Sequence, residues 1–355
     1  MTHRYAETAL REFAATLFTH AGMEADKAAV VAETLVEGDL LGHDTHGLAH
    51  LPPYLDALAN GDMLGAGQPE ILNETPVAQT WHGRKLPGPW LVRQAADWAS
   101  EKARTFGLGA VSIQRAGHIG CLAAYLQRIA ERGQILLIFS SDPSTASVAP
   151  WGGTQRIFTP NPIAAGWGQG GSSVMMDISM SITTNAMTAR RRAEGTQFPA
   201  PTLLTAEGTP TPDPNAFFTQ PGGTLLPLGG TQAGHKGAAL GMLVEALTSG
   251  LSGYGRKDPS AGWGAALLIL VLDPARFGGA ENFAAESQWM ADAVHGNPPV
   301  QGGEPPRLPG ERGLARKAEQ HFKGVALHPS IPPLLRARGE KAGVAFPAPL
   351  EQYPF

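Results

Sequence analysis

The feature that most constrains this chain is a histidine-rich turn between two predicted helices, Gly42-His43-Asp44-Thr45-His46-Gly47-Leu48-Ala49-His50. It holds three of the 11 histidines found in 355 residues, so the clustering indicates a site. Imidazole has an unperturbed pKa of about 6.5 and changes protonation readily near neutral pH. The turn therefore predicts a centre for proton transfer or for metal binding.

Amphipathic patterns on both sides of this turn predict helices. Apolar residues recur at helical spacing over residues 5–20 and 24–40, and Gly42 is expected to end the second helix. Pro52 and Pro53 suit the first turn of a third helix that runs to Ala59. The N-terminal region is therefore expected to be small and helical.

From about Pro69 onward the pattern changes, and strands and helices alternate. The predicted order is helix 90–106, strand 109–114, a glycine turn at 117–120, helix 121–132 and strand 134–140. Residues 141–172 and 199–230 are rich in Gly and Pro and are expected to be irregular. The remaining predicted elements are strands 173–179 and 265–272, of which the second is apolar throughout, and helices 235–251, 281–294 and 313–321. This alternation predicts an α/β fold.

Composition excludes several classes of partner. The net charge is −4 and no basic stripe stands out, so neither nucleic acid nor a membrane surface is an expected partner. Every apolar run is shorter than the roughly 18 residues that span a bilayer. The N-terminus lacks the apolar core of a signal peptide, and the single cysteine, Cys121, cannot form an intrachain disulfide. These features predict a cytoplasmic protein.

Three short motifs could bind anions, although a Rossmann fingerprint is excluded. The near match Gly107-Leu108-Gly109 precedes a strand instead of following one, and it lacks the third glycine. The turn Gly117-His118-Ile119-Gly120 is compatible with a phosphate site or with a tight connection. His235-Lys236-Gly237 and Pro309-Gly310-Glu311-Arg312 each offer charge at a predicted turn or helix start, and each is also compatible with a solvated surface.

The histidine turn itself allows three interpretations on spacing alone. His46 and His50 are four residues apart, as paired metal ligands on a helix often are, and His43 or Asp44 would then complete the set. Alternatively, His46 is a general acid with the Thr45 hydroxyl beside it. In the third interpretation, the histidines cap backbone groups at a helix start.

Seven motifs taken together resemble a known family across nearly the whole chain. They are the histidine turn with Leu51-Pro52, the turn 117–120, Ala149-Pro150-Trp151-Gly152-Gly153, Asn161-Pro162, Asp177-Ile178-Ser179-Met180-Ser181, His235-Lys236-Gly237 and Leu308-Pro309-Gly310-Glu311. Their order and spacing resemble the type-2 malate/L-lactate dehydrogenases. This group of NAD(P)-dependent enzymes lacks a Rossmann fold and includes 2,3-diketo-L-gulonate, ureidoglycolate and piperideine-2-carboxylate oxidoreductases.

The resemblance implies a reaction and roles for named residues. A 2-oxo acid, or a related carbonyl or imine acid, would be reduced by hydride to the 2-hydroxy acid, with His46 as proton donor and Thr45 as its orienter. His118 is the second candidate for the acid/base, and Asp177 would lie near nicotinamide and substrate. The residues implied to bind NAD or NADP are His118, Gly120, Met175, Met176, Asp177, Ile178, Ser179, Ser181, His235, Lys236, Pro309, Gly310, Glu311 and Arg312. No metal is implied.

Two positions expected to contact substrate depart from the family pattern. His50 stands where the family usually has an arginine that binds the substrate carboxylate, and Pro160 replaces a threonine. Imidazole lacks the bidentate fork of a guanidinium, so an unusual substrate or lost activity is expected. The run Arg190-Arg191-Arg192 could supply the missing charge, although a solvated basic run is the simpler interpretation.

The resemblance also implies an organisation and leaves two other functions open. Residues 1–75 would form a helical region that carries His46, residues 76–310 a non-Rossmann cofactor- and substrate-binding sheet domain, and residues 311–355 a helical segment that packs back. A homodimer is implied. A metal-dependent hydrolase or lyase built on His43, His46 and His50 is the alternative from another class. A relative that binds dinucleotide without turnover is the third.

Overall fold

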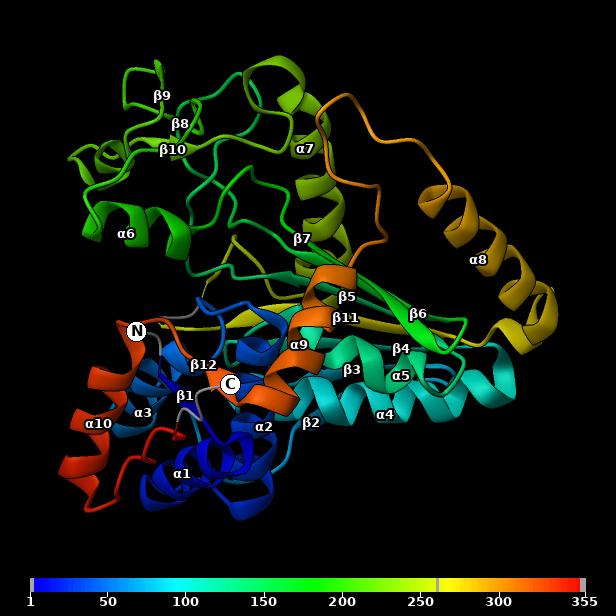
Figure 1. The fold of residues 1–355 in the computed structure, drawn as a ribbon, viewed down its shortest axis with the longest axis horizontal. Coiled ribbons are helices and arrows are strands. Elements are labelled where there is room, and N and C mark those ends of the chain that lie inside the picture. The colour runs from blue at the N-terminus through cyan, green and yellow to red at the C-terminus, as the bar shows by residue number, and fades with distance from the viewer. Residues whose placement is uncertain (1–2, 260–261, 352–355) are drawn as a thin grey trace.

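A seven-stranded sheet forms the centre of the computed structural model, which describes residues 3–259 and 262–351 (Figure 1). The strand order is β2-β3-β4-β11-β5-β6-β7. The bounds are β2 (Glu70–Glu74), β3 (Ala78–His82), β4 (Leu108–Ala116), β5 (Ile135–Ser141), β6 (Ile163–Gln169), β7 (Ser172–Ile178) and β11 (Ala265–Leu272).

The pairing pattern of this sheet is mostly antiparallel. Among the strands of the described chain, β3 and β4 are the one parallel pair in the sheet. A Rossmann fold requires a largely parallel sheet, so the α/β fold without that architecture is confirmed. The apolar strand β11 lies at the middle position and is buried along most of its length, as its sequence predicts.

Helices cover both faces of the sheet. On one face, α4 (Gly88–Phe106), η2 (Leu122–Tyr125) and α5 (Leu126–Ala130) pack against β4, β5 and β11 around one large apolar core. On the other face lie α7 (Gly230–Glu245) with its extension η4 (Ala246–Gly250), and α8 (Ala280–His295), which is followed by an irregular segment. The short 3-10 helix η5 (Pro274–Arg276) connects β11 to α8.

A helical layer formed by both ends of the chain packs beside the sheet. Its elements are α1 (Glu7–His20), α2 (Ala25–Leu41), η1 (Leu48–His50), α3 (Leu51–Asn60), α9 (Glu311–Lys323), α10 (Ile331–Ala342) and the two-stranded pair β1 (Arg4–Tyr5) and β12 (Val325–Ala326). N-terminal side chains such as Leu10 and Leu35 share one core with Val325 and Leu335. The C-terminal segment therefore packs back onto the N-terminal helices.

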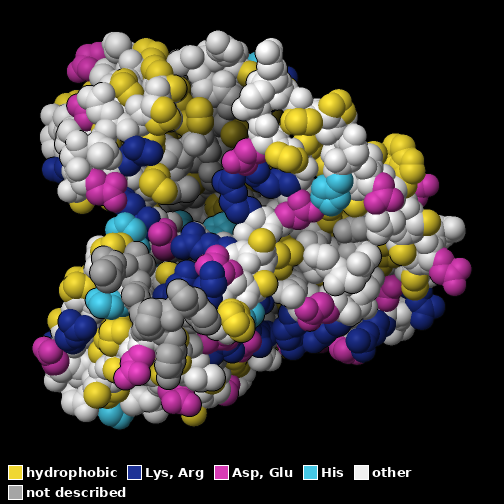
Figure 2. All heavy atoms as spheres, in the orientation of Figure 1, with side chains coloured by type: hydrophobic (Ala, Val, Ile, Leu, Met, Phe, Trp, Pro, Cys, Tyr) yellow, Lys and Arg dark blue, Asp and Glu magenta, His cyan; other side chains and the backbone are white. Residues whose placement is uncertain are grey.

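A smaller lobe, which we call the cap, lies on the side of the histidine turn that faces away from the helical layer. It contains α6 (Asn185–Ala193), β8 (Leu203–Leu204), β9 (Pro210–Thr211), η3 (Pro214–Phe218) and β10 (Thr224–Leu225), which surround a separate core. A cleft opens between the cap and the helical layer, and Lys, Arg and His side chains gather at its inner end (Figure 2).

The structure corrects several predicted elements. The predicted helix 121–132 is a 3-10 turn followed by a five-residue α-helix. The stretch 141–172, expected to be irregular, contains β6, and the loop 199–230 contains the short strands of the cap. The edge strand β2, its neighbour β3 and the helices α6 and α10 were not predicted as individual elements. No helix in the described ranges combines the length and the apolar character needed to span a bilayer.

Candidate functional site

The end of helix α2 sets the direction of the histidine turn. Gly42 adopts a left-handed conformation (φ 89°), which costs little only for glycine. The N–H of Gly42 donates to the carbonyl of Asp39 at 3.0 Å, and the N–H of His43 donates to that of Gly38 at 2.8 Å. These bonds close the helix and direct the next residues into the cleft.

A buried carboxyl group supports the turn from below. Asp39, on α2, accepts a hydrogen bond from the Leu48 N–H at 2.8 Å, and burial raises its pKa to about 8. The backbone of Gly47 crosses this carboxyl so closely that a Cβ there would lie 2.5 Å from its atoms. Asp39 and Gly47 therefore fix where the turn delivers His46.

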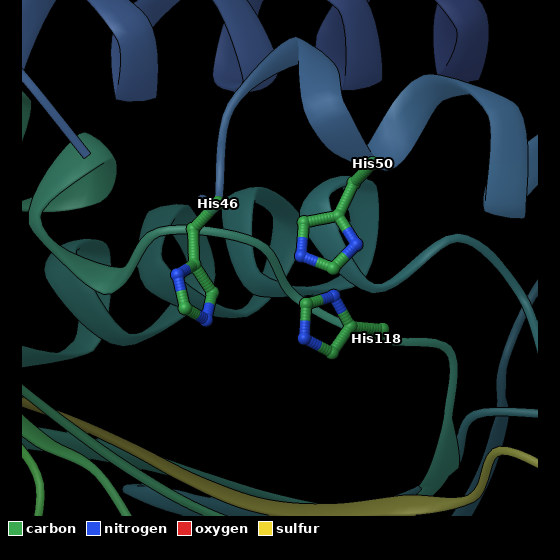
Figure 3. Close-up of side chains that lie close together, drawn as sticks. All are labelled: His46, His50 and His118. Atoms are coloured by element: carbon green, nitrogen blue, oxygen red, sulfur yellow. The ribbon is translucent and has the colours of Figure 1, made fainter. Parts of the chain in front are cut away.

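Three histidines from two separate segments form one cluster. His46 and His50 come from the turn, and His118 comes from the glycine turn after β4 (Figure 3). One ring nitrogen of each lies within 4.8 Å of one from each of the others. The ring centroids of His50 and His118 are 4.4 Å apart, and those of His46 and His50 are 5.5 Å apart. Sequence spacing paired His46 with His50, whereas the fold adds His118.

The three rings have different hydrogen-bond partners. Nδ1 of His46 lies 2.9 Å from the Thr45 hydroxyl oxygen. Nδ1 of His118 lies 2.9 Å from the hydroxyl of Tyr54, which donates to the His118 carbonyl at 3.0 Å. Both ring nitrogens of His50 are buried without a hydrogen-bond partner among the described residues.

All three histidines favour the neutral form. Burial lowers the pKa of His46, and the carboxylate of Asp177 partly opposes that effect. Burial lowers the pKa of His50 to about 3 and that of His118 to well below its usual value. The centre therefore carries little positive charge at neutral pH, and it can accept a proton or hold a cation.

A second cluster lies next to the first. His43, Cys121 and Asp177 have ligand atoms within 4.8 Å of one another. The N–H of Ala123, in η2, donates to Oδ2 of Asp177 at 2.9 Å and fixes the orientation of this carboxylate. The structure thus places His43 with Asp177, and not with His46 and His50 as the predicted metal set required.

A cavity of about 470 Å³ brings together five of the residues predicted to bind cofactor, namely Met175, Asp177, Pro309, Gly310 and Arg312. His43 and two further arginines, Arg307 and Arg316, also line it. The two sides of the cavity are joined by a hydrogen bond from the Met175 N–H to the Pro309 carbonyl, at 3.0 Å. The side chain of Glu311 is engaged elsewhere, because it accepts from the Leu308 N–H at 2.9 Å and contacts His295 at 2.5 Å.

The other predicted cofactor residues lie away from this cavity. Alternation along β7 places Met176 on the sheet face that packs against α7, and Ile178 points to the same side. Ser179 and Ser181 donate to backbone carbonyls in the turn after β7. His235 and Lys236 are exposed on α7, just after a non-helical residue at Ala233, and Gly120 adopts a left-handed conformation (φ 67°) beside His118.

Two residues expected to contact substrate lie in different surroundings. His50 is part of the three-histidine centre. Pro160 precedes the buried Asn161, and its carbonyl accepts from the Met180 N–H at 2.8 Å. This bond ties the loop before β6 to the segment that leads into the cap.

The sequence did not single out Tyr54, and it offered Arg190 only as one of three arginines in a basic run. Tyr54, fully buried on α3, supports His118 as described above. Arg190, from α6 in the cap, reaches across the cleft and forms an ion pair with Asp44 at 2.8 Å. No sequence motif marks Tyr54, and nothing in the arginine run distinguishes Arg190 from its neighbours.

Comparisons with known proteins agree with this fold. The family model described as malate/L-lactate dehydrogenase matches residues 5–334. An L-lactate dehydrogenase of Cupriavidus necator is 32% identical over 96% of this chain and 98% of its own. A (2R)-3-sulfolactate dehydrogenase (NADP(+)) of Chromohalobacter salexigens is 31% identical over 83% of this chain and 86% of its own. The crystal structure of a malate dehydrogenase from Entamoeba histolytica superimposes with a TM-score of 0.92 at 22% identity, covering 98% of this chain and 100% of that one.

Proposed function

Because the chain belongs to the malate/L-lactate dehydrogenase family, we propose that it is an NAD(P)-dependent enzyme that interconverts a 2-oxo acid, or a related carbonyl or imine acid, and its 2-hydroxy acid, with His46 as acid/base. Its class, a dehydrogenase or reductase acting on a CH–OH group, follows from its relatives. The observation that carries the finer proposal is the electrostatic interaction of His46 with Asp177, a carboxylate that lines the cavity described above.

The cavity next to His46 suits a dinucleotide. Its volume of about 470 Å³ lies within the usual range for ligand pockets. Arg307, Arg312 and Arg316 line the cavity and supply cationic groups for phosphates, and Arg307 and Arg312 also pair with Glu304. If bound here, the reduced nicotinamide of NADH or NADPH would supply the hydride. The arginines would hold the phosphates of the cofactor, and the 309–310 turn would line its site.

His46 gives or takes the proton that accompanies the hydride. In the tautomer in which Nδ1 carries a hydrogen, Nδ1 donates to the Thr45 hydroxyl whether the ring is neutral or protonated. Nε2 is then the atom that exchanges the proton. Asp177 stabilises the protonated ring, because its carboxylate raises the pKa of His46. We keep His118 as the second candidate for the acid/base, although its lower pKa favours His46.

Burial of the rings explains why the three histidines have different roles in this proposal. His118 and His50 are neutral at physiological pH, so they contact substrate as dipoles instead of cations. Tyr54 holds the His118 ring in place through its hydroxyl. Proton transfer by a positioned group such as His46 typically accelerates a reaction about 10²- to 10⁴-fold.

We also propose a homodimer in the cytoplasm, with the three parts 1–75, 76–310 and 311–355. Exposed apolar side chains on α7 and α8, such as Met242 and Trp289, support an interface between two copies. The free thiol of Cys121 supports a reducing compartment. Sedimentation analysis would test the dimer, and limited proteolysis would test the boundaries.

The direct test of the proposed function is turnover with a panel of 2-oxo acids. Protein treated with a chelator is mixed with NADH or NADPH, and oxidation of the nicotinamide is followed by its absorbance. We expect at least one acid to be reduced with one of the two cofactors. If no acid in a panel of aliphatic, dicarboxylic, sulfonated and cyclic imine substrates reacts, the proposal fails.

The three-histidine centre also favours a second candidate, a metal-dependent hydrolase or lyase. Zinc sites with three histidine ligands and one open position are common in such enzymes. The ligand atoms of His46, His50 and His118 are close enough for modest side-chain rotation to bring them around one ion. Stoichiometric zinc in the purified protein, and hydrolytic activity lost on chelation, would favour this candidate over the first.

A further inference from the structure

We infer that Arg190, on helix α6 of the cap, is the residue that binds the carboxylate of the substrate. This inference rests on the proposed function, because it names the group that recognises the 2-oxo acid at the same site. It assigns specificity to a side chain from a different lobe than the one that carries His46.

A 2-oxo acid needs a cation beside its carboxylate, and the histidine centre does not offer one. Nδ1 of His46 is already paired with the Thr45 hydroxyl and Nδ1 of His118 with the Tyr54 hydroxyl. A neutral imidazole donates at most one hydrogen bond per ring, whereas a guanidinium binds both oxygens of a carboxylate. The cation for the substrate must therefore come from another element.

Arg190 is the arginine that reaches this centre from the cap. Its Nη1 lies 2.8 Å from Oδ1 of Asp44, two residues before His46, and the guanidinium contributes to lowering the pKa of His46. Its side chain is 19% exposed, so solvent screens its charge less than on an open surface. Arg307, Arg312 and Arg316 lie instead around the cofactor cavity.

The contacts of Arg190 leave room for a ligand. Within the part of the chain that the structure describes, Asp44 is its one hydrogen-bond partner, and this bond uses Nη1 alone. Nε and Nη2 remain to donate to a second carboxylate. Asp44 holds the guanidinium at the cleft while a substrate binds its other edge.

The neighbouring arginines have other contacts and serve as matched controls. Arg191 donates to the carbonyl of Gln197 and stacks over Phe198. Arg192 lies over the ring of Phe218. Both belong to the same helix and carry the same charge, so they control for changes in net charge and helix stability.

The test compares KM for the best 2-oxo acid of the panel among Arg190→Gln, Arg191→Gln and Arg192→Gln. We expect Arg190→Gln to raise KM about 10- to 100-fold, the usual weight of a charged hydrogen bond to a carboxylate. The two controls should change KM by less than about threefold. An Arg190→Gln variant with unchanged KM overturns the inference, whereas a wild-type protein that reduces no 2-oxo acid overturns the proposed function instead.

Asp44→Asn separates carboxylate binding from a purely structural role. If Arg190 only ties the cap to the histidine turn, Asp44→Asn breaks the same ion pair and should raise KM as much as Arg190→Gln does. If Arg190 binds substrate, Asp44→Asn keeps the guanidinium and should raise KM far less.

Chemical rescue provides a readout that loss of folding cannot imitate. In Arg190→Ala, added guanidinium chloride should restore part of the lost kcat/KM, whereas sodium chloride or urea at the same concentration should not. The primary amide of the same 2-oxo acid should be affected little by Arg190→Gln, because it has no carboxylate. Equal rescue by sodium chloride, or an equal loss with the amide, would contradict the inference.

Discussion

At the scale of single residues, the account depends on a proton at His46. Its Nδ1 is paired with Thr45, and its environment favours the neutral ring. Replacing His46 with Gln removes the titrating group and keeps a polar side chain. We expect kcat to fall about 10²- to 10⁴-fold, because positioned acid catalysis is lost.

Steady-state kinetics measure this loss, and thermal melting with cofactor shows whether binding survives. His20→Gln, at an exposed position at the end of α1, is the matched control and should retain full activity. Turnover of His46→Gln within a few fold of wild type would move the acid/base role to another group, of which His118 is the next candidate.

The pH dependence of hydroxy-acid oxidation reports the same residue. The base must be deprotonated, and burial lowers the pKa of His46 below 6.5. Log(kcat/KM) should therefore rise with pH only on the acid side and stay level through neutrality. Asp177 raises the pKa of His46, so Asp177→Asn should move the rising limb to lower pH.

The measurement is a pH profile of kcat/KM for both proteins with the same hydroxy acid. A limb centred above the ordinary histidine value, or one that moves to higher pH in Asp177→Asn, would contradict this assignment.

Residue chemistry was only partly predictable from the sequence. The cluster of His43, His46 and His50 was visible in the chain, but its division into two groups was not, because His118 and Asp177 join from distant segments. The contact between Arg190 and Asp44 spans 146 positions, and no local pattern encodes such a contact.

At the scale of elements, the turn after α2 positions His46 through a close backbone approach. A Cβ at Gly47 would lie 2.5 Å from the buried Asp39 carboxyl, so Gly47→Ala requires the turn to move. We expect a loss of about 1–3 kcal/mol in the free energy of unfolding, as in other overpacked sites, with a fall in kcat.

Urea denaturation of Gly47→Ala and of wild type measures the difference. Gly278→Ala is the control, because a Cβ at that position would meet nothing within 4 Å. If Gly47→Ala unfolds at the same urea concentration as wild type and keeps its activity, the turn is not held in this way.

The long periodic elements were predictable, and the short ones were not. Helices α1, α2 and α4 and strand β11 have apolar patterns that decide their type without tertiary context. Helix α6 has one buried side chain and three arginines, so its sequence shows little apolar period. The strands of the cap have two residues each, too few to show alternation.

At the scale of the whole molecule, the alternation of strands and helices predicted the α/β class, and the missing glycine fingerprint, together with the family resemblance, predicted the absence of a Rossmann fold. The sheet order could not be derived, because β11 enters between β4 and β5 from a position more than a hundred residues later in the chain. The return of α10 to the N-terminal helices was predicted only in outline, since its long-range packing has no local signature.

Cofactor binding should stabilise the whole fold. Ligand at about 100 times its Kd adds about 2.7 kcal/mol to the free energy of unfolding, and a domain of 150–250 residues gains roughly 2–4 °C per kcal/mol. We expect a rise of several degrees with NADH or with NADPH, and a smaller rise with the other. Sodium phosphate at the same concentration is the control. If neither cofactor raises the melting temperature, the proposal that the cavity at Pro309 and Gly310 binds the cofactor is contradicted.

Transfer of deuterium from the cofactor to the product tests the central claim most directly. The protein is incubated with the best 2-oxo acid and with NADH or NADPH labelled with deuterium at C4 of the nicotinamide, once on each face, and the product is analysed by mass spectrometry. We predict that one labelled form gives a 2-hydroxy acid with one deuterium at C2 and that the other gives none. Product without deuterium from either form would contradict hydride transfer at this site.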